Sequence, residues 1–228
     1  MKFDMFTGKA EAYAKARPSY AKEAIEYILS LVPSNAVFTD IGAGTGKFSE
    51  LIAAKGNTIY AVEPNADMRS QLERTLSSYD NAFIIEGSSY DTTLRDGCID
   101  VICCAQALHW FDTQLYMAEC KRIGKEKFLV VVVYNEETGR DPESRHEKAI
   151  ADFLDSPIMA EFPNTISYTR EHWLTFMTSH SGDPSPDSKE YPKHLKKMNE
   201  IFDSSQIDGI KYVEGTTTVS IQLIDNPN

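Results

Sequence analysis

Short apolar runs alternate with amphipathic segments over most of the first 135 residues. The apolar runs are rich in β-branched residues and predict strands at 37–39, 58–62, 82–86, 99–104 and 128–134. The segments between them carry apolar residues at helical spacing and predict helices that begin near 19, 47, 65 and 112. Since strands and helices alternate, we expect a parallel, doubly wound α/β sheet.

The pattern after residue 135 is less regular. Its apolar residues predict helices at 143–154, 170–178 and 195–202 and a short strand at 165–168. Residues 216–224 alternate apolar and polar positions, which is typical of an edge or antiparallel strand. Nothing divides the chain into independent units, so we expect a single domain over residues 1–228.

Composition narrows the class of partner. Lys and Arg number 23 against 34 Asp and Glu, a net charge of −11, which disfavours nucleic acid and anionic membranes. The N-terminus has no signal-peptide pattern, and no apolar run reaches the about 18 residues of a membrane span. We therefore expect a cytoplasmic protein, a monomer or homodimer, with a small or neutral partner.

Three glycines recur at every second position directly after the first predicted strand, at Gly42, Gly44 and Gly46. Glycine can take a positive φ and lets a ligand approach the backbone closely, here beside the N–H groups that begin the next helix. The second strand ends at Glu63, and a right-handed crossover brings that carboxylate to the same edge of the sheet. A carboxylate there can accept both hydroxyls of a ribose, so the stretch predicts a nucleoside pocket.

Two residues distinguish this loop from the loop of a dinucleotide-binding site. Lys47 occupies the position of the last glycine in the G-x-G-x-x-G fingerprint, which argues against NAD and FAD. Asp40 adds an acid that would repel a diphosphate but would hold an ammonium group.

The sequence D-I-G-A-G-T-G at 40–46, followed by V-E-P at 62–64, resembles the cofactor motifs of class I S-adenosylmethionine-dependent methyltransferases. Residues 16–20 and 107–112, with Tyr13, resemble the branch that acts on small molecules, including trans-aconitate methyltransferase-like proteins. The resemblance covers nearly the whole chain. It implies a Rossmann-like, seven-stranded sheet that is mostly parallel, with an antiparallel last strand and a small helical cap.

This resemblance also implies a division of the domain and a set of contacts. We expect an N-terminal helical lid at 1–35, a cofactor-binding core at 36–134, and late strands at 135–228 with the cap at about 170–203. The residues expected at S-adenosylmethionine are Tyr13, Arg17, Asp40, Gly42, Ala43, Gly44, Gly46, Glu63, Pro64, Met68, Ser89, Tyr90, Ala105 and Gln106. Of these, Ser89 and Tyr90 would face adenine, and Ala105 and Gln106 the methionine part. His109 and Trp110 would face the substrate.

Each of these residues also has a structural interpretation. Glu63 could cap the helix that begins at Asn65, and Asp40 could bind only the amides of the loop. Met68 could be a core residue. Trp110 could fill the gap beneath the next helix, and the N-terminal residues Tyr13, Arg17 and Tyr20 could simply pack.

The predicted reaction is in-line transfer of a methyl group to a small-molecule acceptor, without a metal. A hydroxyl, amine or carbon acceptor needs a base, for which His109 and then Tyr20 are the candidates. Two other functions remain open, an NAD-dependent oxidoreductase and a non-catalytic S-adenosylmethionine-binding protein.

Overall fold

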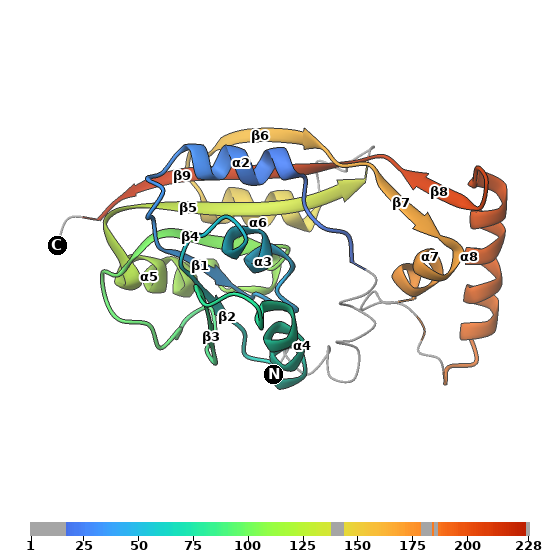
Figure 1. Ribbon diagram of the computed structural model, residues 1–228, viewed down its shortest axis with the longest axis horizontal. Helices are drawn as coiled ribbons and strands as arrows, with labels where there is room; N and C mark the ends of the chain where they lie inside the picture. Colours follow the sequence, from blue (N-terminus) through green and yellow to red (C-terminus); the bar gives the residue numbers. More distant parts are fainter. Residues whose placement is uncertain (1–16, 138–143, 179–183, 185–186, 227–228) are drawn as a thin grey trace.

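The computed structural model describes residues 17–137, 144–178, 184 and 187–226. One seven-stranded sheet forms the body of the molecule, in the strand order β3-β2-β1-β4-β5-β9-β6 (Figure 1). Its strands are β1 (Phe38–Ile41), β2 (Ile59–Val62), β3 (Ala82–Ile85), β4 (Ile99–Ala105), β5 (Gly124–Glu137), β6 (Ile158–Pro163) and β9 (Gly215–Asp225). Tyr13 and the rest of segment 1–16 lie outside the described residues.

The first five strands are parallel and β9 runs against them. β9 pairs antiparallel with β5 over Lys127↔Asp225 to Glu137↔Gly215, and β6 pairs antiparallel with β9 on its other side. The expected Rossmann-like sheet with an antiparallel last strand is confirmed. That strand is internal, because β6, which its sequence pattern did not reveal, covers the edge.

Helices cover both faces of the sheet. The bounds are α2 (Lys22–Ser30), α3 (Lys47–Ala53), α4 (Ala66–Leu76), α5 (Thr113–Ile123) and α6 (Arg145–Phe153), and the 3₁₀ turn η2 spans Leu108–Trp110. One core packs α2 and α3 against the sheet through residues such as Ile25, Phe48 and Val131. The other packs α5 and α6 through Tyr116, Phe153 and Val132. The strands between these layers are apolar on both faces for this reason.

Capping side chains fix where the central helices begin. Asn65 accepts a hydrogen bond from the Met68 amide (3.0 Å), and Asp112 accepts from the amide of Leu115 (3.1 Å), so α4 and α5 begin as predicted. The first helix was expected near residue 19 but begins at Lys22. Ala21 has non-helical dihedral angles, and its amide donates to Thr217 Oγ1 (3.0 Å) instead of joining the helix.

A smaller unit, here called the cap, lies between β6 and β9 in the chain. It consists of β7 (Ile166–Thr169), α7 (Arg170–Met177), α8 (Tyr191–Ser205) and β8 (Ile210–Val213), and β7 and β8 form a separate two-stranded sheet. The cap has its own core, made by Tyr168, Trp173, Phe176 and Phe202. Figure 1 shows it beyond the ends of β5 and β6, at the opposite end of the molecule from α5.

None of the helices in the described ranges combines the length and the apolar character that crossing a membrane requires.

Candidate active site

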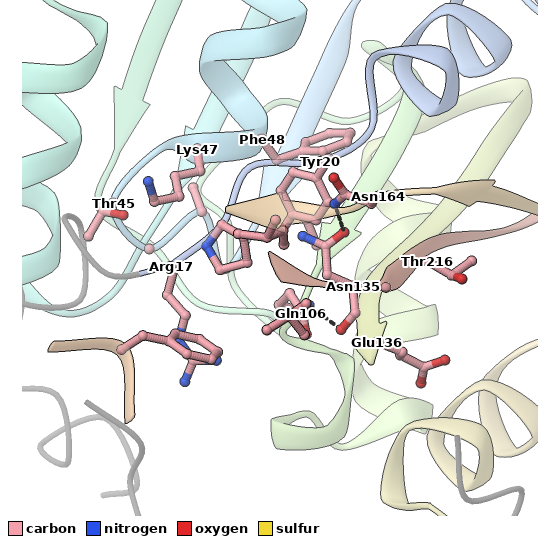
Figure 2. Close-up of a pocket in the computed structure, with 18 of the residues that line it drawn as sticks. Arg17, Tyr20, Thr45, Lys47, Phe48, Gln106, Asn135, Glu136, Asn164 and Thr216 are labelled. Carbon is pink, nitrogen blue, oxygen red and sulfur yellow. Dashed lines mark hydrogen bonds between the residues drawn. The ribbon is translucent and has the colours of Figure 1, made fainter. Parts of the chain in front are cut away.

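A pocket lies where the carboxyl ends of β1, β4 and β5 face the cap (Figure 2). Its two sides come from different parts of the chain. The side here called the loop side consists of Arg17, Pro18, Tyr20, Asp40, Gly42, Ala43, Gly44, Thr45, Lys47, Phe48, Ala105 and Gln106. The side here called the cap side consists of Asn135, Glu136, Asn164, Ile166, Tyr168, Phe176, Val213, Gly215 and Thr216.

The three glycines after β1 all have positive φ, but their surroundings differ. A Cβ on Gly42 would lie 2.8 Å from Ala107 Cβ, and a Cβ on Gly46 would lie 2.7 Å from Leu72 Cδ1. Side-chain packing therefore requires glycine at these two positions. A Cβ on Gly44 would meet no atom within 4 Å, because Gly44 faces the open pocket. Gly44 is thus the position where a ligand can approach the backbone.

Asp40 places a buried carboxyl at the bottom of the loop side. Its side chain is only 1% exposed, and Oδ2 accepts a hydrogen bond from Ser49 Oγ at 2.7 Å. Oδ1 is buried and has no hydrogen-bond partner among the residues that the structure describes. Burial raises the pKa of Asp40 to about 7. The hydrogen bond from Ser49 lowers this pKa, and the negative charge of Glu63 raises it further. A donor from a ligand, above all a cationic one, would satisfy Oδ1 and favour the ionised form.

Glu63 holds the glycine loop in place. Its Oε2 accepts from the Gly44 amide and its Oε1 from the Asn65 amide, each at 2.9 Å. Burial raises the pKa of Glu63, and these two backbone donors and Arg69 partly offset that rise. A carboxylate has about four acceptor positions, so the same side chain can support the loop and accept from a ligand.

Side chains from three segments join the N-terminal segment to the cap side. Asn135 and Asn164 both donate to the Ser19 carbonyl, at 3.1 and 3.0 Å. Asn164 also donates to Asn135 Oδ1 (3.1 Å) and to Thr217 Oγ1 (3.1 Å), while Thr217 donates to Asn135 Oδ1 (2.6 Å). This asparagine network, made by Ser19, Asn135, Asn164 and Thr217, fixes the segment that carries Arg17 and Tyr20.

The guanidinium of Arg17 lies 5.5 Å from the centre of the Phe176 ring, at the boundary between the two sides. Tyr20 packs edge-on against Phe48, with ring centres 5.6 Å apart. Lys47, at the start of α3, is the second cation of the pocket, and burial lowers its pKa. In Figure 2, Arg17 and Lys47 lie on one side of Gln106 and Asn135, and Glu136 and Thr216 lie on the other.

His109 and Trp110 lie in η2 and are not among the described residues that line the pocket. The His109 amide donates to the Tyr134 hydroxyl (3.3 Å), and Nδ1 lies 3.2 Å from the same oxygen. Burial, with the nearby charges of Arg145, His146 and Arg17, lowers the pKa of His109 to about 3. His109 is therefore a neutral imidazole that is hydrogen-bonded to Tyr134. The Trp110 ring stacks under the guanidinium of Arg145, at 5.1 Å.

The remaining expected residues lie outside the pocket lining. Met68 is 3% exposed and belongs to the face of α4 that packs inward. Ser89 is buried, while Tyr90 is 50% exposed. The Pro64 carbonyl accepts from Arg69 Nη1 at 2.6 Å. The structure thus brings together Arg17, Tyr20, Asp40, Gly42, Ala43, Gly44, Ala105 and Gln106.

Sequence reasoning missed most of the cap side. Asn135 and Glu136 directly follow the predicted strand at 128–134, so two polar residues at the carboxyl end of a strand were the available signal. Asn164 and Thr216 had no such signal, because β6 and β9 bring them to the pocket only in the folded sheet.

Comparison with known proteins shows which family shares these features. Residues 39–132 match the family model described as methyltransferase domain. An uncharacterised methyltransferase of Mycobacterium tuberculosis is 30% identical over 130 residues, which are 57% of this chain and 51% of that protein. An uncharacterised methyltransferase-like protein of Schizosaccharomyces pombe is 31% identical over 137 residues, 58% of this chain and 52% of that protein. The chain spans about half the length of these curated relatives.

The fold is shared more widely. A candidate type II methyltransferase from Anaeromyxobacter dehalogenans superimposes with a TM-score of 0.70 at 19% identity, covering 93% of this chain and 99% of that one. The matched segment 39–132 contains the glycine loop, β2, β3 and β4, and parts of β1 and β5. Over residues 39–132 the chain therefore matches the methyltransferase domain family, and as a whole it has the fold of a solved methyltransferase.

Proposed function

We propose that the protein binds S-adenosylmethionine on the loop side of the pocket and transfers its methyl group to a small-molecule acceptor on the cap side. One observation carries the proposal. Asp40, whose buried Oδ1 has no hydrogen-bond partner among the described residues, lines the same pocket as Gly44, where the backbone is open to a ligand. An α-ammonium group supplies the donor that this oxygen lacks.

The other residues of the loop side match the remaining parts of that molecule. Arg17 and Lys47 provide positive charge for an α-carboxylate. Ala105 and Gln106 end β4 beside the loop, and Gln106 has a left-handed backbone (φ 59°) that redirects the chain at that point. Glu63, with Pro64, Met68, Ser89 and Tyr90, is the proposed nucleoside end, where Glu63 both supports Gly44 and accepts from the ribose.

The sulfonium of S-adenosylmethionine supplies an already activated methyl group. The residues of this chain have to bind the two reactants in line and exclude water. Alignment of this kind contributes about 7–11 kcal/mol to lowering the barrier. The apolar wall formed by Ile166, Tyr168, Phe176 and Val213 is suited to a small organic acceptor.

Calorimetric titration with S-adenosylhomocysteine, S-adenosylmethionine and NADH tests the proposal. We expect both adenosyl compounds to bind and NADH not to bind. Asp40→Asn, which keeps the size of the side chain, should weaken their binding. If NADH binds and neither adenosyl compound does, the protein is an oxidoreductase and the proposal is wrong.

A further inference from the structure

The proposed binding of the methyl donor makes no use of Glu136. It lies near the end of β5, opposite Thr216 of β9, and lines the cap side of the pocket. Asp40, Arg17 and Lys47 already match the ammonium and carboxylate groups of the donor. In Figure 2, Glu136 lies away from Arg17 and Lys47, beyond Gln106 and Asn135. Among the described residues that line the cap side, Glu136 is the one with a charged side chain.

A layer of packed rings, His146, Tyr134 and His109, lies next to Glu136. Its Oε1 lies 3.6 Å from Nδ1 of His146 in α6. The His146 ring stacks on Tyr134, with centres 4.2 Å apart and planes at 13°, and contacts His109 with centres 4.7 Å apart. Tyr134 is in turn bonded to His109. The Glu136 side chain is only 11% exposed, so this layer holds a carboxyl group in a fixed place at low solvent contact.

Beside its polar residues, the cap side has an apolar and aromatic wall. Tyr168 and Phe176 stack, with ring centres 5.3 Å apart and planes at 26°, and both line the pocket. Aromatic faces attract cations as well as apolar groups. The Glu136 carboxylate and the two aromatic rings on the same side of the pocket have the chemistry to bind an organic cation.

We propose that the acceptor is a small amine with an apolar body, and that Glu136 binds its ammonium group and takes a proton from it. This inference rests on the proposed methyl transfer and names the acceptor class for the same site. His146 is a positioning residue, which orients Glu136 and is the next group able to receive the proton.

The step balances without any further reactant. The ammonium gives one proton to the Glu136 carboxylate, which leaves a lone pair on nitrogen. That pair forms the new C–N bond with the methyl carbon, while the C–S bond breaks and its electron pair stays on sulfur. The products are a methylated ammonium, a thioether and a protonated Glu136, which loses its proton through His146, whose side chain is 23% exposed.

Binding to the complex with S-adenosylhomocysteine tests the inference without requiring turnover. Benzylamine and benzoate, which share a ring and differ in charge, are titrated into this complex. We expect benzylamine to bind at least tenfold more tightly. Glu136→Gln should remove this preference, whereas Glu126→Gln, an exposed glutamate on the same strand, should keep it.

Equal affinities, including no measurable binding of either probe, would overturn the inference, as would a preference that survives Glu136→Gln. The wild-type preference alone decides the matter if that variant does not fold. Binding of S-adenosylhomocysteine is measured first, with no probe present. Its absence refutes the proposed methyl transfer, while its presence with no preference for the amine refutes only the acceptor class.

Discussion

The two sides of the pocket differ in how the chain builds them. The loop side comes mainly from two short contiguous segments, 40–48 and 105–106, joined by the N-terminal residues Arg17, Pro18 and Tyr20. The cap side is assembled from residues in or next to β5, β6, β7, α7, β8 and β9, which extend from Asn135 to Thr216 in the sequence. The first depends on backbone geometry and the second on side chains that meet only after folding.

The two sides should therefore differ in the substitutions that they tolerate. A site made by the backbone depends on local dihedral angles, so one substitution can destroy it. Such a site suits the methyl donor, whose structure is the same for every enzyme that uses it. A side-chain site changes one contact at a time and can select an acceptor. We therefore expect changes on the loop side to affect donor binding, and changes in the cap to leave it largely intact.

The largest effect is expected in the core of the cap. Phe202 is 1% exposed and packs with Tyr168, Trp173 and Phe176. Phe202→Ala should cost about 3–5 kcal/mol, because it leaves a cavity in that small core. Hydrogen exchange should show opening confined to the cap, with S-adenosylhomocysteine still bound. Simultaneous loss of protection in the sheet would contradict the separation of the two regions.

The glycine loop offers a matched pair. Gly44→Ala places a methyl group in the open pocket, and we expect about a hundredfold weaker binding of S-adenosylhomocysteine, equivalent to about 2.7 kcal/mol. Its cost in stability should be only about 1 kcal/mol, from the positive φ. Gly42→Ala, whose Cβ would meet Ala107 at 2.8 Å, should destabilise the fold more. Thermal denaturation and calorimetry on both variants measure the two effects separately.

Asp40 should make donor binding depend on pH. Its pKa is raised from 3.8 to about 7, so between these values the free protein holds a proton that an unfolded chain releases, and its stability falls as the pH rises. An ammonium ligand favours the ionised form, so affinity should fall by up to tenfold per pH unit below about 7. Asp40→Asn should weaken binding by about 2 kcal/mol at pH 7 and remove this dependence. Calorimetric titrations from pH 5.5 to 7 measure how the affinity depends on pH. If Asp40→Asn shows the same dependence as the wild type, another group causes it.

The smallest effect is expected in the asparagine network. Asn164→Ala removes hydrogen bonds to Ser19, Asn135 and Thr217, and should cost about 1 kcal/mol of stability. Because the network fixes the segment of Arg17, we also expect a few-fold loss of affinity for S-adenosylhomocysteine.

Asn57→Ala is the matched control. Asn57 donates to the carbonyls of Ser34 and Ala36, at 3.0 and 3.1 Å, outside the pocket. It should lose comparable stability but no affinity. If both variants bind equally well, the network only stabilises the fold.

The sequence predicted the part of the molecule whose signals are local. The strands β1 to β5 were found because each is a short apolar run, and the starts of α4 and α5 because Asn65 and Asp112 cap them. β6 was missed because its exposed edge position gives no clear apolar alternation. β8 has only four residues and pairs with β7 alone.

The site residues could likewise be predicted only where their signals are local. Asp40 and Gly44 could be placed from the residues around them, whereas Asn164 and Thr216 depend on which strands become neighbours. His109 follows the strand end that was expected to face the substrate, and the turn η2 places it against the Tyr134 hydroxyl, outside the lining of the described pocket. Strand order and side-chain direction after a turn are tertiary properties, and no local pattern specifies them.

The points where the chain leaves and re-enters the main sheet adjoin each other. The Asn164 amide donates to the Gly215 carbonyl at 2.8 Å, and a Cβ on Gly215 would lie 2.9 Å from the Glu136 carbonyl oxygen. Glycine thus permits a closed junction, and residues 165–214 form a loop whose two ends are already joined. An insertion of this kind can be lengthened, shortened or exchanged between homologues while the sheet beneath it stays in register, which gives evolution and protein engineering a defined place at which to change substrate choice.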